Sequence, residues 1–452
     1  MNEHKLSIFC EGAPSDSVAW RQSGEVSRAQ FVADVVELAT QLPDAEWVLN
    51  HCDDRYDFAV GFAAAMVRGQ VSLFPSSKAP QVLQQLAADY PGVYCLTDQE
   101  DTEDVQSVMP LKRFPELTAE AGDNADLAFP AAQMAVIAFT SGSTGQPKAY
   151  RRHWGAFVRE AEVAGKALQL DRQQGGYIVA TVPAQHMYGF MASVIMPLQW
   201  RYVIGADRPF YPENIRKALA ARPRPSVLVT TPVQLRACVL EQTQLPATEF
   251  ILSSTAPLSA DMAQQAESAF GAIVKEFYGS TETGAIAIRR QAESAVWHTF
   301  DDVTVKQADD GFEVHGKYFT VSPMLLADNV DISSDRHFQL YGRNADLVKV
   351  GGKRISIGDL NQALLSIEGV DDGAFFLPDI GVDGREARLT AFVVAPALSR
   401  EQLMEALRNK VDAVFLPRPL YMVPSLPRND TGKLPRNNLV SLHQQQQASQ
   451  GF

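Results

Sequence analysis

Cysteine and long apolar runs are both scarce in this chain of 452 residues. Its four cysteines, Cys10, Cys52, Cys95 and Cys238, are too far apart in sequence for a metal-binding or redox pair. We therefore expect reduced, structural thiols and a cytoplasmic protein. No run of about 18 apolar residues occurs, and the start of the chain has no apolar segment of signal-peptide length, so we expect no membrane insertion.

Basic residues are also fewer than acidic residues. The chain has 40 Lys and Arg against 53 Asp and Glu, a formal net charge of −13. Such an excess repels phosphate backbones, so we expect no nucleic-acid partner. The deficit is uneven, because the segment from Arg343 to the end carries 13 Lys and Arg and 12 Asp and Glu. This change in charge indicates a boundary near residue 343.

Apolar runs alternate with helical periodicity in the first three quarters of the chain. EWVLN (residues 46–50), VSLFP (71–75) and YIVATV (177–182) are typical strands, and each is followed by a segment with helical spacing. This alternation predicts an α/β fold of layered, mostly parallel sheets. Such sheets bind ligands at the carboxyl ends of their strands.

The pattern changes after residue 316. A strand, a hairpin and a helix are predicted over residues 336–370, and Ser399 with Gln402 forms a capping-box pattern for a later helix. The sequence therefore predicts a large N-terminal α/β domain (1–343), a small C-terminal α+β domain (344–440) and a low-complexity tail (441–452) that we expect to be disordered.

A loop rich in hydroxyl groups follows the apolar run MAVIAF (134–139). It combines flexible glycines, hydroxyl donors and one lysine: Thr140, Ser141, Gly142, Ser143, Thr144, Gly145 and Lys148. Glycine lets backbone N–H groups approach an anion, and the lysine adds a positive charge. The loop lacks the Gly-Lys-Ser/Thr ending of a Walker loop. Alone, the pattern is compatible with either a phosphate cradle or an ordinary surface loop.

Three later segments carry candidate site residues. In KEFYGSTETGAIA (275–287), Tyr278 offers a ring for a base and Glu282 a carboxylate for Mg²⁺. Asp328 and Arg343 bracket a predicted hairpin and suit ribose hydroxyls. In LPRNDTGKLPRNNL (426–439), a tight turn presents Lys433. Each of these features is more often structural or a solvated charge when it occurs alone.

Together and in this order, the four segments resemble the adenylate-forming superfamily of acyl- and aryl-CoA synthetases, peptide-synthetase adenylation domains and luciferases. STAPLS (254–259) looks like its adenine-side turn, and AQHMYGF (184–190) resembles its aromatic box. The resemblance implies that a carboxylate attacks the α-phosphate of Mg-ATP, giving an acyl adenylate and pyrophosphate. A pantetheine thiol of CoA or of an acyl carrier protein then displaces AMP.

The resemblance also assigns roles to individual residues. The loop residues from Thr140 to Lys148 named above would hold the β- and γ-phosphates. Thr281 would contact the α-phosphate, and Glu282 would position Mg²⁺. Tyr278 would stack on adenine, and Ala256 and Gly279 would also line the nucleotide site. Asp328 and Arg343 would bind the ribose. In the adenylating state, Lys433 would bridge the substrate carboxylate and the α-phosphate.

The resemblance further implies that the C-terminal domain rotates about a hinge just after Arg343. That rotation would withdraw Lys433 and bring Gly351 and Gly352 to a pantetheine tunnel. The family usually has a charged residue two positions after the arginine, whereas this chain has Ala345 followed by Asp346. The pivot is therefore left open between these two residues.

The aromatic box bears on the choice of acid. Amino-acid-activating members place an aspartate there, whereas this chain has His186, which resembles the histidine that gates the thiol tunnel in acyl- and aryl-CoA synthetases. We therefore expect a non-amino carboxylic acid. The compact chain is similar to stand-alone ligases of aryl-polyene and pigment pathways. Alternatives are a satisfied core histidine at 186, an amino-acid-activating enzyme, a luciferase-type oxygenase and a catalytically silent nucleotide-binding regulator.

Overall fold

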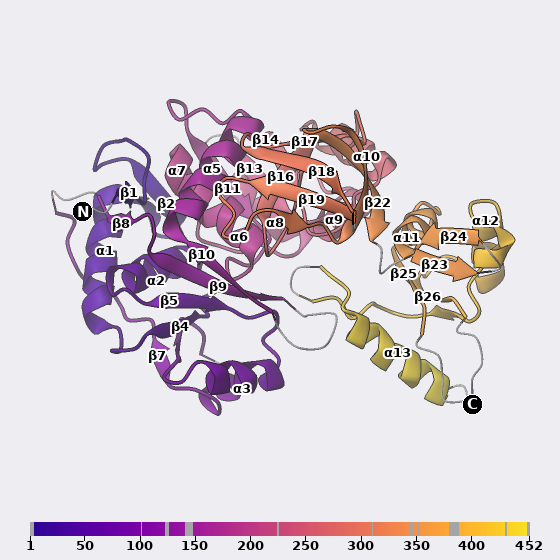
Figure 1. The fold of residues 1–452 in the computed structure, drawn as a ribbon, viewed down its shortest axis with the longest axis horizontal. Coiled ribbons are helices and arrows are strands. Elements are labelled where there is room, and N and C mark those ends of the chain that lie inside the picture. Colours follow the sequence, from indigo (N-terminus) through magenta and orange to yellow (C-terminus); the bar gives the residue numbers. More distant parts are fainter. Residues whose placement is uncertain are drawn as a thin grey trace.

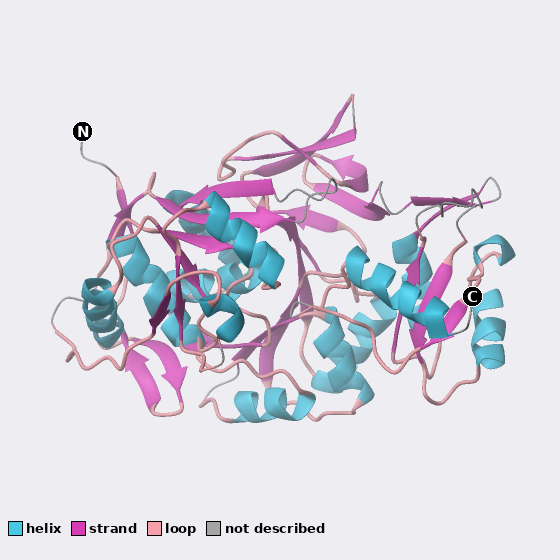
Figure 2. Ribbon diagram, turned by 90° about the horizontal axis from the view of Figure 1, so that it is seen from below, coloured by secondary structure: helices cyan, strands magenta, loops and turns pink. Residues whose placement is uncertain are grey.

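The computed structural model describes most of the chain, namely residues 4–100, 102–122, 126–140, 148–223, 226–309, 311–343, 347–350, 353–378, 388–429 and 432–449. Helices flank the strands of two large sheets, and the elements after residue 346 gather at one end of the molecule (Figure 1, Figure 2). No helix in the described ranges is long and apolar enough to cross a membrane. The predicted α/β architecture is therefore confirmed.

The first large sheet has six strands in its described part. Their spatial order is β10 (Lys148–His153), β9 (Met134–Thr140), β5 (Val71–Phe74), β4 (Trp47–Asn50), β6 (Tyr94–Thr97) and β7 (Leu111–Arg113). All neighbours pair in parallel except β9 and β10. The runs predicted as strands at 46–50 and 71–75 are β4 and β5, which lie inside the sheet.

The second large sheet has eleven strands among the described residues. Their order is β21 (Asp328–Ser334), β22 (His337–Arg343), β17 (Trp297–Thr299), β16 (Gly284–Arg289), β15 (Val274–Ser280), β14 (Thr248–Ser253), β13 (Ser226–Thr230), β11 (Gly176–Ala180), β12 (Tyr202–Gly205), β2 (Ser17–Arg21) and β3 (Gly24–Ser27). The central strands from β15 to β2 are parallel. Their carboxyl ends therefore share one edge, which is where the ligand site is expected.

Helices pack between and beside these sheets. They are α1 (Arg28–Gln41), α2 (Arg55–Val67), α3 (Pro80–Asp89), α4 (Glu103–Gln106), α5 (Trp154–Leu168), α6 (Met187–Phe190), the π-helical turn η1 (Met191–Ile195), α7 (Met196–Trp200), α8 (Pro212–Ala220), α9 (Pro232–Leu240) and α10 (Ala260–Phe270). Two smaller sheets complete this part of the fold. In one, β1 (Lys5–Ser7) pairs with β8 (Ala128–Pro130). In the other, β19 (Gly311–Gly316) lies between β18 (Val303–Ala308) and β20 (Met324–Leu325).

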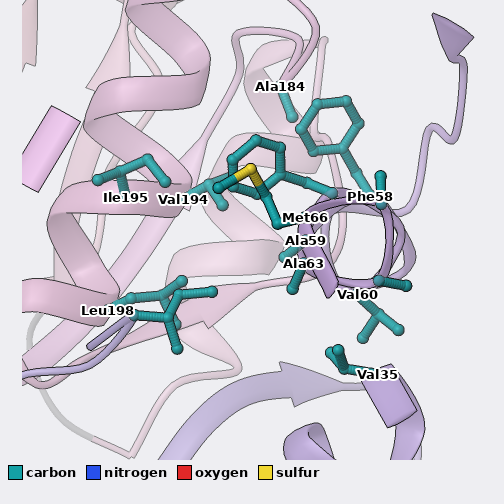
Figure 3. Close-up of a cluster of buried hydrophobic side chains, with 14 of the residues drawn as sticks. Val35, Phe58, Ala59, Val60, Ala63, Met66, Ala184, Val194, Ile195 and Leu198 are labelled. Carbon is teal, nitrogen blue, oxygen red and sulfur yellow. The ribbon is translucent and has the colours of Figure 1, made fainter. Parts of the chain in front are cut away.

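Helix α2 lies at the centre of the N-terminal core. From Phe58 onward it is apolar on every face, and it contacts β4 and β5 of the first sheet and β12 of the second. Figure 3 shows its Phe58 beside Ala184 and its Met66 beside Val194 of η1. A helix that is apolar all round is stable only when it is surrounded by protein. The burial of α2 therefore joins the two sheets into one core.

The C-terminal elements form hydrophobic clusters of their own. They are β23 (Leu347–Val350), β24 (Lys353–Ser356), α11 (Ile357–Leu365), β25 (Asp372–Phe376), β26 (Thr390–Val394), α12 (Arg400–Arg408), η3 (Ala413–Phe415), β27 (Leu420–Met422) and α13 (Arg436–Ser449). Two buried clusters draw all their members from residues 348–442. The capping box of Ser399 and Gln402 at the start of α12 is confirmed.

The structure differs from the sequence prediction at the tail. Residues 441–449 were expected to be disordered, but they belong to α13. The ring of His443 lies 5.8 Å from that of Phe376 and 6.0 Å from that of Tyr421, and Leu439 is buried in the same cluster. Glutamine is a good helix former, so a single packed face is enough to order the run.

A glycine in α5 tests how tightly the N-terminal core is packed. A Cβ on Gly165 would lie 2.1 Å from the Trp200 indole, whose Nε1 donates to the Ala161 carbonyl at 2.8 Å. Alanine favours helices over glycine by about 1 kcal/mol, whereas overpacking costs about 1–3 kcal/mol. We expect Gly165→Ala to lower the free energy of unfolding by up to about 2 kcal/mol in urea denaturation. The control is Gly122→Ala, where the new Cβ meets nothing within 4 Å; equal stability of the two variants would contradict tight packing at Trp200.

Candidate active site

The predicted site residues of the second sheet lie along its carboxyl edge. Neighbouring parallel strands β11, β13, β14 and β15 end side by side. The segments that follow three of them carry His186, Ala256 and Thr281, and all three residues are half-buried. Sequence alone could not establish that these segments are neighbours, because they are about 25 to 70 residues apart.

A tight hairpin presents Thr281 and Glu282. Strands β15 and β16 pair with Gly279 opposite Ala285 and Ser280 opposite Gly284. A Cβ on Gly279 would lie 2.0 Å from the Gly284 carbonyl oxygen, so only glycine fits there. The Thr283 hydroxyl accepts from the Ser280 amide at 3.2 Å and donates to the Gly284 carbonyl at 2.8 Å. Glu282 therefore lies at the tip of a rigid turn.

The first sheet brings the hydroxyl-rich loop to the same place. Thr140 ends β9 and lies opposite Lys148, the first residue of β10. The five residues from Ser141 to Gly145 lie outside the described ranges. Lys148 is exposed and Thr140 is half-buried.

Tyr150 connects this loop to the hairpin and was missed by the sequence reasoning. Its hydroxyl lies near the Glu282 carboxylate and the Thr140 hydroxyl, and both groups affect its pKa. Burial raises the pKa of Tyr150, and the negative charge of Glu282 raises it further. Tyr150 is two residues after Lys148 in a strand, so the two side chains share a face. This two-residue spacing is the sequence feature that could have identified Tyr150 as a site residue.

Tyr278 and Asp328 are in direct contact. The Tyr278 hydroxyl donates to Asp328 Oδ2 at 2.6 Å, and the Tyr278 ring lies 5.5 Å from Trp297. Asp328 pairs across the β21–β22 ladder with Arg343, whose side chain lies outside the described set. The predicted base-binding ring and ribose-binding carboxylate are thus side by side.

The turn before Lys433 contacts the same edge. The Lys433 amide donates to Asn429 Oδ1 at 2.9 Å, and Gly432 has a φ of +74°. A Cβ on Gly432 would lie 3.1 Å from Val233 Cγ2 and 3.4 Å from Thr231 Oγ1. Because Thr231 directly follows β13, the turn lies at the carboxyl edge of the second sheet. Lys433 itself is exposed.

His186 is the N-cap residue of α6 and is half-buried. Two residues later, the hydroxyl of Tyr188 donates to the Leu252 carbonyl at 2.8 Å, so it spans from α6 to the end of β14. Gly351 and Gly352 lie outside the described ranges, and the structure gives no position for the predicted tunnel residues.

A buried ion pair braces the strand after the hydroxyl-rich loop against the β15–β16 hairpin. Arg152 of β10 contacts Glu160 Oε2 of α5 at 2.6 Å, and both side chains are at most 2% exposed. Glu160 Oε1 accepts from the Ala285 amide at 2.7 Å. A Cβ on Gly284, whose φ is +71°, would lie 2.3 Å from the same carboxylate. Glu160 therefore ties the strand that starts at Lys148 to the hairpin that carries Glu282.

The Glu282 carboxylate is a candidate ligand for a metal ion. In the part of the chain that the structure describes, no three His, Cys, Asp or Glu side chains gather as a metal cage. Mg²⁺ binds through one or two carboxylates together with phosphate oxygens and waters. Glu282, beside the Thr140 and Tyr150 hydroxyls, fits a Mg²⁺ ion that arrives with a polyphosphate.

Removing the brace should destabilise the fold. Glu160→Ala leaves the Arg152 charge buried without its partner, so we expect a loss of about 3–5 kcal/mol in the free energy of unfolding. The matched control on the same helix is Glu162→Ala. Glu162 pairs with Arg159 and Lys166 near the surface, and its loss should cost less than about 1 kcal/mol. Similar losses for both variants in urea denaturation would contradict a special role for the buried pair.

The chain is similar to several ligases of known activity. The chain is 30% identical over 326 residues to 4-coumarate–CoA ligase of Halorhodospira halophila, covering 69% of this chain and 78% of that protein. It is 21% identical to 3,4-dihydroxybenzoate–[aryl-carrier protein] ligase of Bacillus anthracis, covering 75% and 83%. It superposes on o-succinylbenzoate-CoA synthetase of Bacillus subtilis, solved with ATP and magnesium, with a TM-score of 0.80, 17% identity and coverage of 97% and 100%.

The family model described as AMP-binding enzyme matches residues 26–312. This span contains the hydroxyl-rich loop, the aromatic box and the Glu282 hairpin. Since the model covers well over half of the sequence, the resemblance to adenylate-forming enzymes is confirmed: the chain belongs to the AMP-binding enzyme family.

Proposed function

We propose that this chain is an AMP-forming ligase that joins a non-amino carboxylic acid, aryl or acyl, to a pantetheine thiol. The observation that carries the proposal is the gathering of Glu282, the Tyr278–Asp328 pair and the Lys433 turn at one sheet edge. These are the groups that a nucleotide and its triphosphate require. The names of relatives that ligate 4-coumarate or dihydroxybenzoate support the class of acid.

The proposed reaction has two steps. In the first, a carboxylate oxygen forms a bond to the α-phosphorus of ATP, and the bond from that phosphorus to pyrophosphate breaks. In the second, the thiol sulfur forms a bond to the acyl carbon, AMP leaves, and the thiol proton is released. The first step brings an anion to a polyanion, so its barrier depends on positive charge and hydrogen-bond donors placed in advance.

Each predicted site group has a proposed part in the first step. Tyr278 stacks on adenine, and Asp328 with Arg343 binds the ribose. Thr140 and Lys148 bind the outer phosphates, and Thr281 the α-phosphate. Lys433 neutralises the charge between the carboxylate and the α-phosphate. When bound by Glu282, Mg²⁺ would offset the phosphate charge.

The second step would need a different arrangement of the C-terminal elements. We propose that residues 344–440 act as a mobile domain that withdraws Lys433, while Gly351 and Gly352 approach the pantetheine arm beside His186. CoA and a carrier protein present the same arm. Names of relatives support both acceptors, since one is a CoA ligase and another an aryl-carrier-protein ligase.

Pyrophosphate release tests the proposal directly. A panel of benzoic, cinnamic and aliphatic acids and amino acids is offered with Mg-ATP to wild type and to Lys433→Ala. We expect one class of non-amino acid to give a strong signal, and the variant to lose on the order of 10²–10³ in rate. ATP binding without release for any acid would favour the regulator instead, and release with amino acids alone would favour an adenylation domain.

The assignment of Glu282 predicts a change in metal requirement. Glu282→Gln removes the carboxylate charge, so the Mg²⁺ concentration for half-maximal pyrophosphate release should rise by about tenfold or more. The control is Glu293→Gln, because Glu293 is exposed and pairs with Arg290 on the surface. An unchanged Mg²⁺ titration in Glu282→Gln would remove Glu282 from the metal site.

A further inference from the structure

An arginine of α9 reaches across to the C-terminal elements. Arg236 Nε donates to the Asp371 carbonyl at 2.9 Å, and Nη2 donates to the carbonyls of Leu365 at 3.2 Å and of Val370. Leu365 is the last residue of α11, where helix carbonyls lack partners and the helix dipole is negative. Arg236 therefore caps a helix to which it does not belong.

The capped segment leads straight to the lysine turn. Asp372, next to Asp371, binds the Arg428 guanidinium through both carboxylate oxygens, at 2.7 and 2.8 Å. The third nitrogen of Arg428 donates to the Gly432 carbonyl at 2.8 Å. Bidentate pairs of this kind are geometrically specific. A continuous chain of contacts, here called the arginine relay, thus runs from Arg236 through Asp371–Asp372 and Arg428 to Gly432.

The same short segment of α9 meets the relay at both of its ends. Gly432 packs against Thr231 and Val233, at the start of α9, and Arg236 lies one helical turn further on. Two separate contacts with one helix restrict the rotation of the C-terminal elements as well as their distance from α9. The Arg236 side chain is half-buried, and its partial desolvation lowers its pKa.

We propose that Arg236 is a positioning residue for adenylation, acting through the arginine relay to place Lys433 at the carboxyl edge of the second sheet. This inference rests on the function proposed above, since it assigns Lys433 to the first half-reaction. Arg236 does not touch the reacting groups, because its contacts are backbone carbonyls of residues 365–371. Its loss should slow the step that needs Lys433 and leave ATP binding intact.

The experiment compares Arg236→Ala with Arg216→Ala, a control that removes an exposed arginine of α8 paired with Glu213. Single-turnover pyrophosphate release should fall by about tenfold to a hundredfold in Arg236→Ala, the effect of losing charge-assisted hydrogen bonds. The KM for ATP and thioester formation from preformed acyl adenylate should stay within about twofold, since neither depends on Lys433. Arg236→Lys, which reaches fewer carbonyls, should be intermediate and provides a second variant if the alanine form does not fold.

A double variant separates positioning from a general structural effect. If Arg236 acts through Lys433, Arg236→Ala combined with Lys433→Ala should be no slower than Lys433→Ala alone. Additive losses, or an Arg236→Ala rate equal to that of Arg216→Ala, would overturn the inference.

A readout that needs no activity keeps the inference distinct from the proposed function. In Arg236→Ala, amide hydrogen exchange of the peptide containing residues 429–433 should quicken relative to wild type and Arg216→Ala. Faster exchange together with a wild type that releases no pyrophosphate would mean that the relay exists and the proposed function fails. Unchanged exchange and unchanged adenylation in an active enzyme would reject the relay alone.

Discussion

The buried pair of Arg152 and Glu160 is the contact on which the site depends most. Two charges in a low-dielectric interior are stable only when their geometry is nearly ideal, so such a pair accepts few arrangements. Arg152 extends from β10, the strand after the hydroxyl-rich loop. Glu160 accepts a hydrogen bond from the backbone of the β15–β16 hairpin. Because the pair joins segments of the two sheets, the angle between the sheets determines the distance between Lys148 and Glu282. A purely apolar contact would stabilise the packing of these segments equally well. It would, however, allow a wider range of distances between Lys148 and Glu282.

The placement of charge explains how an acidic protein can bind a polyanion. The chain carries a net charge of −13, yet the cations of the proposed site come from three separate elements: Lys148 opens β10, Arg343 closes β22, and Lys433 follows the Gly432 turn. Because each element contributes a single cation, the site does not require an extended basic surface. Lys433 differs from the others because its position depends on contacts between α9 and the C-terminal elements.

Much of the fold and part of the site followed from sequence. The strands at 46–50 and 71–75 and the capping box at Ser399 are local features that neighbouring residues determine. Of the turn predicted before Lys433, Asp430 and Thr431 lie outside the described ranges. Tyr150, Glu160 and Arg236 were not found, because their meaning depends on which strands and helices lie side by side. The helical residues 441–449 were missed for a related reason: a glutamine run has no apolar period, and His443 is ordered by rings distant in sequence.

The hydrogen bonds that Arg236 donates to the C-terminal elements all go to main-chain carbonyls, and this has a consequence for how the sequence can change. Recognition of backbone oxygens places no demand on the identity of the side chains at Leu365 or Val370. The side chains at these two positions are free to change as long as α11 ends at the same point and the Asp372–Arg428 pair is kept. On the α9 side, the contact requires Arg236 together with Thr231 and Val233, which pack against Gly432.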